Sequence, residues 1–179
     1  MKPEELHHIL QAAASLTDKD EFVVVGSQAM VLQTTNVPEE LMSSMEADIY
    51  PRDAPELAHE IDGNLGEGSM FHDTYGYWAH GVGPETPVAP DGWQDRLVSI
   101  TLPRFHTEGT YLTVWLLEAH DLVLAKLAAG RDRDFPYAGA AISAGIVSLE
   151  ELEQRLEGMP DTHRELVRQR LEIVRARLP

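Results

Sequence analysis

The residues best suited to chemistry are two carboxylates, Glu46 and Asp48, which Ile49 and Tyr50 directly follow. In a β-strand, side chains two residues apart point to the same face, so a strand over residues 46–50 places these carboxylates side by side. Two like charges that close repel each other, and such a pair usually has a cation between them. Mg²⁺ is typically held by one or two carboxylates together with substrate phosphates. The pattern therefore predicts a magnesium site at Glu46 and Asp48, and the alternative is a solvated strand face.

A second candidate is the turn at Gly26 and Ser27, which closes an apolar, mostly β-branched run over residues 22–25. Such a run followed by a glycine is typical of a buried strand. Helix-forming residues follow, and backbone N–H groups at a helix start face an anion. Gly26 and Ser27 are therefore predicted to contact a triphosphate. The structural alternative is that Ser27 only caps a helix.

Lys126 is the one cation on an otherwise apolar predicted helix over residues 119–129, which ends at Gly130. Its ammonium group needs either a phosphate partner or a route to water along its own aliphatic stem. In phosphoryl and nucleotidyl transfer the protein mainly positions groups and neutralises charge, so a phosphate is the functional interpretation.

A third metal-binding carboxylate is not evident in the strands predicted at residues 97–102 and 111–117. Asp134 or Glu118 is expected to take that place, unless the site works with two acids. His72 and His80 lie eight residues apart in a glycine-rich stretch, without a recognised zinc spacing, and no zinc site is predicted there.

The remaining elements indicate one α+β domain over residues 1–179. A mixed sheet flanked by helices is expected over about residues 1–121, and a helical part over about residues 120–179. Residues 4–16 carry a helical apolar stripe, and a further helix is expected from about Pro51 to Ile61, with Gly63 after it. Ser148 with Glu151, and Thr162 with Glu165, have the spacing of capping boxes that open helices.

The charge is distributed unevenly along the chain, whose net charge is −16. Residues 1–121 hold 21 acidic and 5 basic residues, whereas residues 122–179 hold 9 of each. Nonspecific nucleic-acid binding needs basic surface, so the composition argues against a general nucleic-acid binder. The exception is an arginine-rich end where a polyanion or an acidic partner surface could dock, formed by Arg131, Arg133, Arg155, Arg164, Arg168, Arg170, Arg175 and Arg177.

The composition also limits the protein class. Without cysteine the chain has neither disulfides nor thiolate metal sites. No segment approaches the ~18 apolar residues of a membrane span, and the acidic N-terminal residues are not a secretory signal. A cytoplasmic protein without a membrane partner is expected.

The motifs resemble those of a known superfamily when they are taken in order. A Gly-Ser turn after a strand, followed by a carboxylate-x-carboxylate strand, is similar to nucleotidyltransferases with a polymerase-β-like palm. Further phrases over about residues 20–157 resemble a bacterial branch akin to the abortive-infection (type IV) toxins: Ser44-Met-Glu-Ala-Asp-Ile-Tyr-Pro51, Gly66-Glu-Gly-Ser69, Gly92-Trp93, and His120-Asp-Leu-Val-Leu-Ala-Lys126 with Gly130-Arg131.

This resemblance implies a Mg²⁺-dependent transfer of NMP from a nucleoside triphosphate. RNA, including tRNA, or a protein is the implied acceptor, and an antitoxin protein is an implied partner. Arg131 and Asp134 resemble the arginine and acid that close the family's site, and a local charge network is their structural alternative. An inactive module that binds a nucleotide or a protein, and a metal-dependent phosphohydrolase, remain the competing hypotheses.

Overall fold

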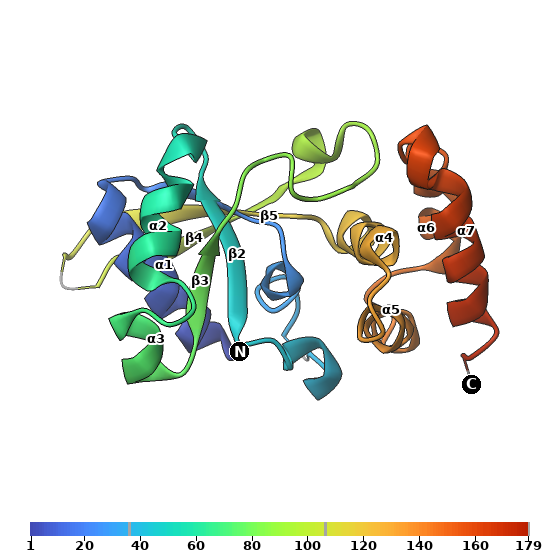
Figure 1. Cartoon of the computed structure of the whole chain (residues 1–179), viewed down its shortest axis with the longest axis horizontal. Helices are drawn as coiled ribbons and strands as arrows, with labels where there is room; N and C mark the ends of the chain where they lie inside the picture. Colours follow the sequence, from blue (N-terminus) through green and yellow to red (C-terminus); the bar gives the residue numbers. More distant parts are fainter. Residues whose placement is uncertain (36, 106, 179) are drawn as a thin grey trace.

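A five-stranded mixed sheet lies at the centre of the structure (Figure 1). The computed structural model describes residues 1–35, 37–105 and 107–178. The strands lie in the order β3-β2-β1-β5-β4. β1 is antiparallel to β2 and parallel to β5, β2 is parallel to β3, and β4 is antiparallel to β5. The strands are β1 (Glu21–Val24), β2 (Glu46–Pro51), β3 (Trp78–Gly81), β4 (Val98–Pro103) and β5 (Tyr111–Leu116).

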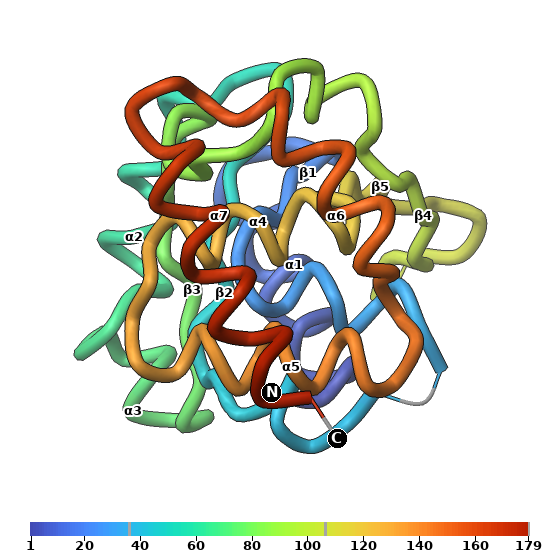
Figure 2. The backbone as a smooth tube through the Cα atoms, turned by 90° about the vertical axis from the view of Figure 1, so that its right-hand side faces the viewer, coloured from blue at the N-terminus to red at the C-terminus, as the bar shows by residue number. Residues whose placement is uncertain are grey.

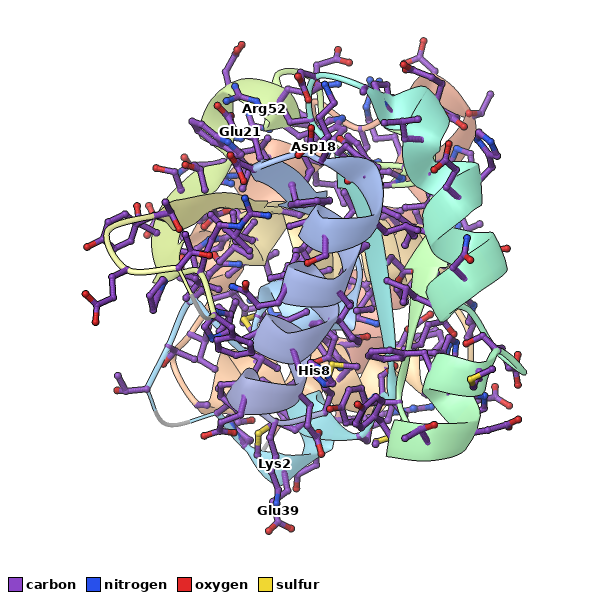
Figure 3. The ribbon with its side chains drawn as sticks, turned by 90° about the vertical axis from the view of Figure 1, so that its left-hand side faces the viewer. Lys2, His8, Asp18, Glu21, Glu39 and Arg52 are labelled. Atoms are coloured by element: carbon purple, nitrogen blue, oxygen red, sulfur yellow. The ribbon has the colours of Figure 1, made fainter. Side chains whose placement is uncertain are left out.

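Three helices lie on one side of this sheet, namely α1 (Pro3–Thr17), α2 (Ala58–Leu65) and α3 (Met70–Tyr75) (Figure 1). Helix α1 buries an apolar stripe that includes Leu6, Ile9 and Leu10, as its 3.6-residue periodicity predicts. In Figure 3, α1 lies in front of the sheet with Lys2 near one end and Asp18 at the other.

Four helices gather on the other side of the sheet, as Figure 2 shows from that side. They are α4 (Ala119–Ala129), α5 (Asp134–Ser143), α6 (Leu149–Leu156) and α7 (Asp161–Arg175). Gly130 ends α4 with a left-handed φ of 63°, and the Arg170 guanidinium group donates hydrogen bonds of 2.7 Å to the carbonyl oxygens of Leu127 and Ala128. The α+β class and the helical C-terminal part are thus confirmed.

Buried apolar side chains from the sheet and from both groups of helices form one cluster, which includes Phe22, Val114, Leu122 and Val167. Short 3₁₀ turns η1 (Ser27–Ala29), η2 (Glu39–Met42), η3 (Pro55–Leu57) and η4 (Trp93–Arg96) connect the larger elements. No helix of the described ranges is both long enough and apolar enough to cross a bilayer.

Several local predictions were wrong. Helix α2 continues through Gly63 and ends at Gly66, whose N–H donates to the Asp62 carbonyl oxygen, so Gly63 does not follow the helix. Thr162 lies inside α7, which begins after Pro160 without a side-chain cap, whereas Ser148 caps α6 by accepting from the Glu151 N–H. A proline fixes the extended backbone conformation before a helix without needing a hydroxyl cap.

Candidate active site

The site begins with three side chains on neighbouring strands. Glu46 and Asp48 lie on β2, and the parallel pairing of β2 with β3 sets Asp48 opposite His80. The His80 Nδ1 atom lies 3.0 Å from an Asp48 oxygen and 3.2 Å from a Glu46 oxygen. One ligand atom from each of the three residues lies within 4.8 Å of the other two, which is close enough for all three to hold one metal ion.

The two carboxylates of this group are close together and partly buried, and both conditions shift pKa values within the group. Burial and the neighbouring Asp48 charge raise the pKa of Glu46, although the charges of His80 and Arg133 oppose this effect. Burial alone would lower the pKa of His80, but its hydrogen bond to Asp48 and the charges of both carboxylates raise the pKa overall. The two carboxylates therefore favour a positive charge between them, from a protonated imidazole or from a cation.

Position 26 has no room for a side chain because it lies against the Asp48 carboxylate. A Cβ atom at this position would lie 1.9 Å from Asp48 Oδ2 and 2.8 Å from Asp48 Cγ. Such distances are far below van der Waals contact, so only glycine lets the turn after β1 approach the Asp48 carboxylate this closely.

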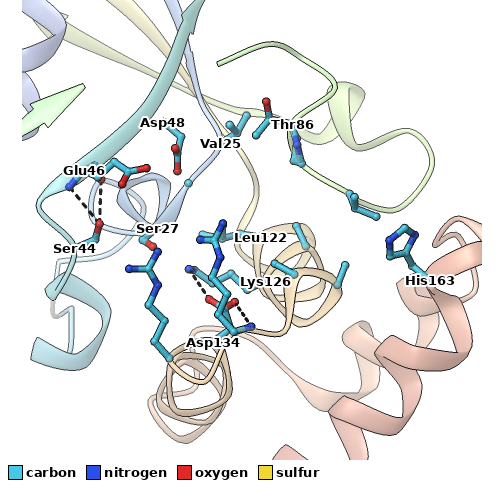
Figure 4. A pocket seen from close by; sticks show the side chains of 18 residues that line it. Val25, Ser27, Ser44, Glu46, Asp48, Thr86, Leu122, Lys126, Asp134 and His163 are labelled. Atoms are coloured by element: carbon cyan, nitrogen blue, oxygen red, sulfur yellow. Dashed lines mark hydrogen bonds and ion pairs between the residues drawn. The ribbon is translucent and has the colours of Figure 1, made fainter. Parts of the chain in front are cut away.

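A cavity of about 230 Å³ opens beside these carboxylates. It lies between the strand ends and α4, and Figure 4 shows Asp48 above Lys126 and Asp134 across this space. Seven residues predicted from the sequence to form the site line it together: Gly26, Ser27, Glu46, Asp48, Lys126, Arg131 and Asp134. Their roles in binding or catalysis remain predictions.

The Lys126 side chain is mostly buried and has a partner inside the protein. Its ammonium group donates to Asp134 Oδ1 at 3.3 Å and lies 4.3 Å from the centre of the Tyr137 ring. Burial lowers the pKa of Lys126, and Asp134 opposes that shift. The Asp134 side chain is only 1% exposed and also accepts from the Arg131 backbone N–H at 2.9 Å. Lys126 is thus held at the cavity by a buried partner.

The turn at Ser27 is joined to the C-terminal helices. Tyr137 on α5 donates its hydroxyl hydrogen bond to the Ser27 carbonyl oxygen at 3.1 Å. Gly26 is the N-cap residue of η1 and forms no side-chain cap bond, so Ser27 is not the capping residue of a helix. The predicted helix after residue 27 is only the three-residue turn η1.

Neither residue expected to supply a third carboxylate belongs to the group that Glu46 and Asp48 form with His80. Glu118 instead caps α4 by accepting from the backbone N–H groups of His120 and Asp121, and it pairs with Arg155. Asp134 lines the cavity but is bonded to Lys126. Within the described ranges, Glu46, Asp48 and His80 are the one group of three or more such side chains close enough to share a metal ion.

Most arginines of the arginine-rich end already contact other groups of the protein. Arg155, Arg164, Arg168 and Arg175 form ion pairs with acids of the helical part, Arg170 binds the end of α4, and Arg177 lies 5.9 Å from the centre of the Phe135 ring. Arg131 and Arg133 line the cavity. Among the residues that the structure describes, neither of their guanidinium groups has an ion-pair partner, so both can pair with an anion bound in the cavity.

His80 and His163 were not predicted from the sequence to belong to the site. His80 enters the site through the register of β2 with β3, a contact between segments about thirty residues apart that no local spacing reveals. His163 lies in the first turn of α7 and reaches the cavity from the far end of the chain. In a strand over Trp78-Ala-His-Gly81, Trp78 and His80 point to the same face, and this alternation was the one local indication of where His80 lies.

Comparisons with known proteins were consistent with the predicted superfamily. Neither a curated protein nor a solved structure matched the chain. One family model, described as a nucleotidyltransferase of unknown function, matched residues 4–175, which is nearly the whole chain. The chain therefore belongs to this nucleotidyltransferase family, DUF6036.

Proposed function

We propose that the protein is a metal-dependent nucleotidyltransferase that transfers a nucleoside monophosphate from a nucleoside triphosphate to an acceptor hydroxyl group. The acceptor oxygen bonds to the α-phosphorus, the bond to pyrophosphate breaks, and the hydroxyl proton passes to water. The observation that carries this proposal is one cavity in which Glu46 and Asp48 face Lys126, Arg131 and Arg133, with His80 bonded to both carboxylates beside it.

The metal is proposed to be Mg²⁺, held by Glu46, Asp48 and His80. The donor set supports a divalent cation because oxygen atoms of two like-charged carboxylates and an imidazole nitrogen lie within 4.8 Å of one another. An imidazole ligand also suits Mn²⁺ and other transition metals, so Mn²⁺ is the second cation to test. A cation bound there would act as a Lewis acid on the phosphate oxygens.

The remaining residues serve the triphosphate in this proposal. Lys126, Arg131 and Arg133 would neutralise the phosphate charges, with arginine suited to bidentate phosphate contacts. Asp134 would orient Lys126 through their 3.3 Å contact. The backbone of Gly26 and Ser27 would approach the phosphates closely because Gly26 carries no side chain.

The acceptor is proposed to be a protein. Of the two acceptor classes implied by the resemblance, RNA would need the arginine-rich end, and most of those arginines already pair within the chain. A toxin role with a protein antitoxin, and a cytoplasmic location, remain proposals that rest on the resemblance alone. Arrest of bacterial growth on expression, relieved by Asp48→Ala, would support the toxin role.

The decisive experiment is transfer of label from each α-labelled nucleoside triphosphate, with Mg²⁺ or Mn²⁺, to total bacterial protein and RNA. Label is expected on protein with the wild type and to be lost in Glu46→Ala/Asp48→Ala. The matched control is Glu39→Ala/Glu40→Ala, which removes two exposed acids of the turn η2 and should transfer label normally. Transfer that survives the Glu46 and Asp48 changes would refute the proposed site.

The second candidate is a binding module without turnover. This candidate is favoured by the third residue of the group, which is His80 and not a carboxylate. It predicts nucleotide binding that depends on Glu46 and Asp48, without label on any acceptor. Release of free labelled NMP would instead indicate hydrolysis with water as acceptor.

A further inference from the structure

The cavity has two chemically different ends. Glu46, Asp48, Lys126 and the two unpaired arginines line one end, whereas the other end is largely apolar. Figure 4 shows Glu46 and His163 at opposite ends, with Leu122 and Lys126 between them. The apolar end is lined by Pro87, Val88, Leu122, Ala125, Ala128, Ala129 and His163.

Helix α4 supplies a flat floor for this end. Leu122, Ala125 and Ala129 are spaced three and four residues apart, so they share one face of the helix. The alanine side chains are short and leave open space above the helix. The segment Thr86-Pro87-Val88 lines the cavity from the loop between β3 and β4, and Figure 4 shows this loop on the opposite side of the space from α4.

The loop is held in place by hydrogen bonds beyond the cavity. The Asp91 N–H donates to the Gly158 carbonyl oxygen at 2.9 Å. The Arg96 guanidinium group donates to the carbonyl oxygens of Asp91 at 3.1 Å and Pro90 at 3.4 Å, and it is itself paired with the buried Asp121 at 2.8 Å. The two walls are thus fixed before any ligand binds, which reduces the entropic cost of binding.

Polar groups at this end can form hydrogen bonds with the edge of a planar ring. His163 Nδ1 lies 2.9 Å from the Thr162 hydroxyl oxygen, which leaves Nε2 as the second hydrogen-bonding atom of the ring. Across the described part of the chain, no protein group bonds to Nε2 or to the Thr86 hydroxyl group. A slot with apolar walls and a few polar edge groups suits a flat heteroaromatic ring.

We propose that this end of the cavity binds the base of the nucleotide, with His163 hydrogen-bonded to the base edge. The base lies between Ala125 on α4 and Val88 on the loop, and the triphosphate extends toward Glu46 and Asp48. The proposal rests on the proposed function and adds the orientation of the nucleotide and a residue that determines base preference. His163 is a specificity residue here and takes no part in the transfer step.

The test is calorimetric binding of ATP, GTP, CTP, UTP and inorganic tripolyphosphate to the full chain in the presence of Mn²⁺. His163→Ala is expected to weaken the preferred nucleotide by about threefold to tenfold, the range for one lost hydrogen bond, and to leave tripolyphosphate unchanged. Ala125→Leu, which fills the slot, is expected to weaken all four nucleotides while tripolyphosphate again binds normally. The control is His59→Ala, an exposed histidine on α2 outside the cavity.

The outcomes separate this inference from the proposed function. Wild-type nucleotide binding that neither His163→Ala nor Ala125→Leu alters would overturn the base site and leave the proposed function standing. Equal weakening of nucleotides and tripolyphosphate by His163→Ala would also overturn it, because the residue would then act at the phosphate end. The proposed function itself would be refuted if the wild type bound no nucleotide, or if Glu46→Ala/Asp48→Ala bound nucleotides as tightly as the wild type.

Discussion

At the scale of single residues, Gly26 and Asp48 leave no room between them for a side chain at position 26. A side chain at position 26 cannot coexist with the Asp48 carboxylate where it now lies, because even a Cβ atom would lie 1.9 Å from Oδ2. Asp48 Cβ would also lie 3.0 Å away, and this atom moves only with the backbone of β2, which is held between β1 and β3, so rotation of the carboxylate does not relieve the whole clash. Gly26 therefore sets the position of a proposed metal ligand without binding anything itself.

Gly26→Ala is expected to displace the Asp48 carboxylate and weaken Mn²⁺ binding by about 10-fold to 100-fold, the range seen when a metal ligand loses its orientation. Titration followed by electron paramagnetic resonance measures this directly. The matched control is Gly63→Ala, because Gly63 lies within α2 and a Cβ there meets no atom within 4 Å. The control should bind metal normally and unfold at a higher temperature, since alanine stabilises a helix by about 0.5–1 kcal/mol over glycine. Unchanged Mn²⁺ affinity in Gly26→Ala would show that Asp48 is not a ligand.

At the scale of elements, a buried ion network joins the start of α4 to α6 and to η4. Asp121 is fully buried and pairs with Arg96 at 2.8 Å and Arg155 at 3.1 Å. Glu118 caps α4 and binds both Arg155 and the His120 ring. The network fixes the end of α4 that carries Leu122, and so holds one wall of the cavity.

This network makes part of the stability depend on pH through Glu118. Burial alone would raise the pKa of Glu118, but the hydrogen bond and charge of His120 and the charge of Arg155 outweigh burial and lower the pKa to about 2. A group whose pKa is lower in the folded state stabilises the fold above its unfolded pKa and loses that contribution as the pH falls through its folded pKa. The contribution is thus complete above about pH 4.5 and is lost between about pH 4.5 and pH 2.

Glu118→Gln is therefore expected to lower the free energy of unfolding at pH 6, by at most about 3 kcal/mol, and the difference from wild type should shrink toward pH 2. Urea unfolding between pH 2.5 and pH 7 measures the difference. Glu153→Gln, which breaks an exposed pair with Arg175, should cost less than about 1 kcal/mol. A difference for Glu118→Gln that stays constant with pH would contradict this account of the network.

At the scale of the whole molecule, charge separates the sheet from the C-terminal helices. All of the net charge of −16 arises from residues 1–121, and the arginines of the helical part mostly meet its own acids. Arg168, for example, pairs with both Glu157 and Glu165. The outer surface therefore offers little unneutralised positive charge to a polyanion.

We accordingly expect no binding of a labelled tRNA-sized RNA at about 0.15 M salt, measured by fluorescence anisotropy at concentrations that detect the 10⁻⁴ to 10⁻⁶ M affinities typical of nonspecific binding. Glu157→Gln/Glu165→Gln leaves Arg168 unpaired and should bind RNA more tightly than wild type at low salt. Tight wild-type binding with a steep salt dependence would instead restore RNA as the favoured acceptor.

Local patterns in the sequence determined the α+β class, the strand that carries Glu46 and Asp48, and the glycine turn before them, because alternation and helix periodicity reflect contacts between near neighbours. Helix α3 was not predicted because it has only six residues, none of them buried, and lies among glycines, although a Ser69 cap opens it. Only the tertiary structure decided that His80 joins the carboxylates, that Asp134 holds Lys126, and that Glu118 turns away to Arg155. Strand register and buried ion pairs depend on which distant segments pack together, and no spacing along the chain encodes that choice.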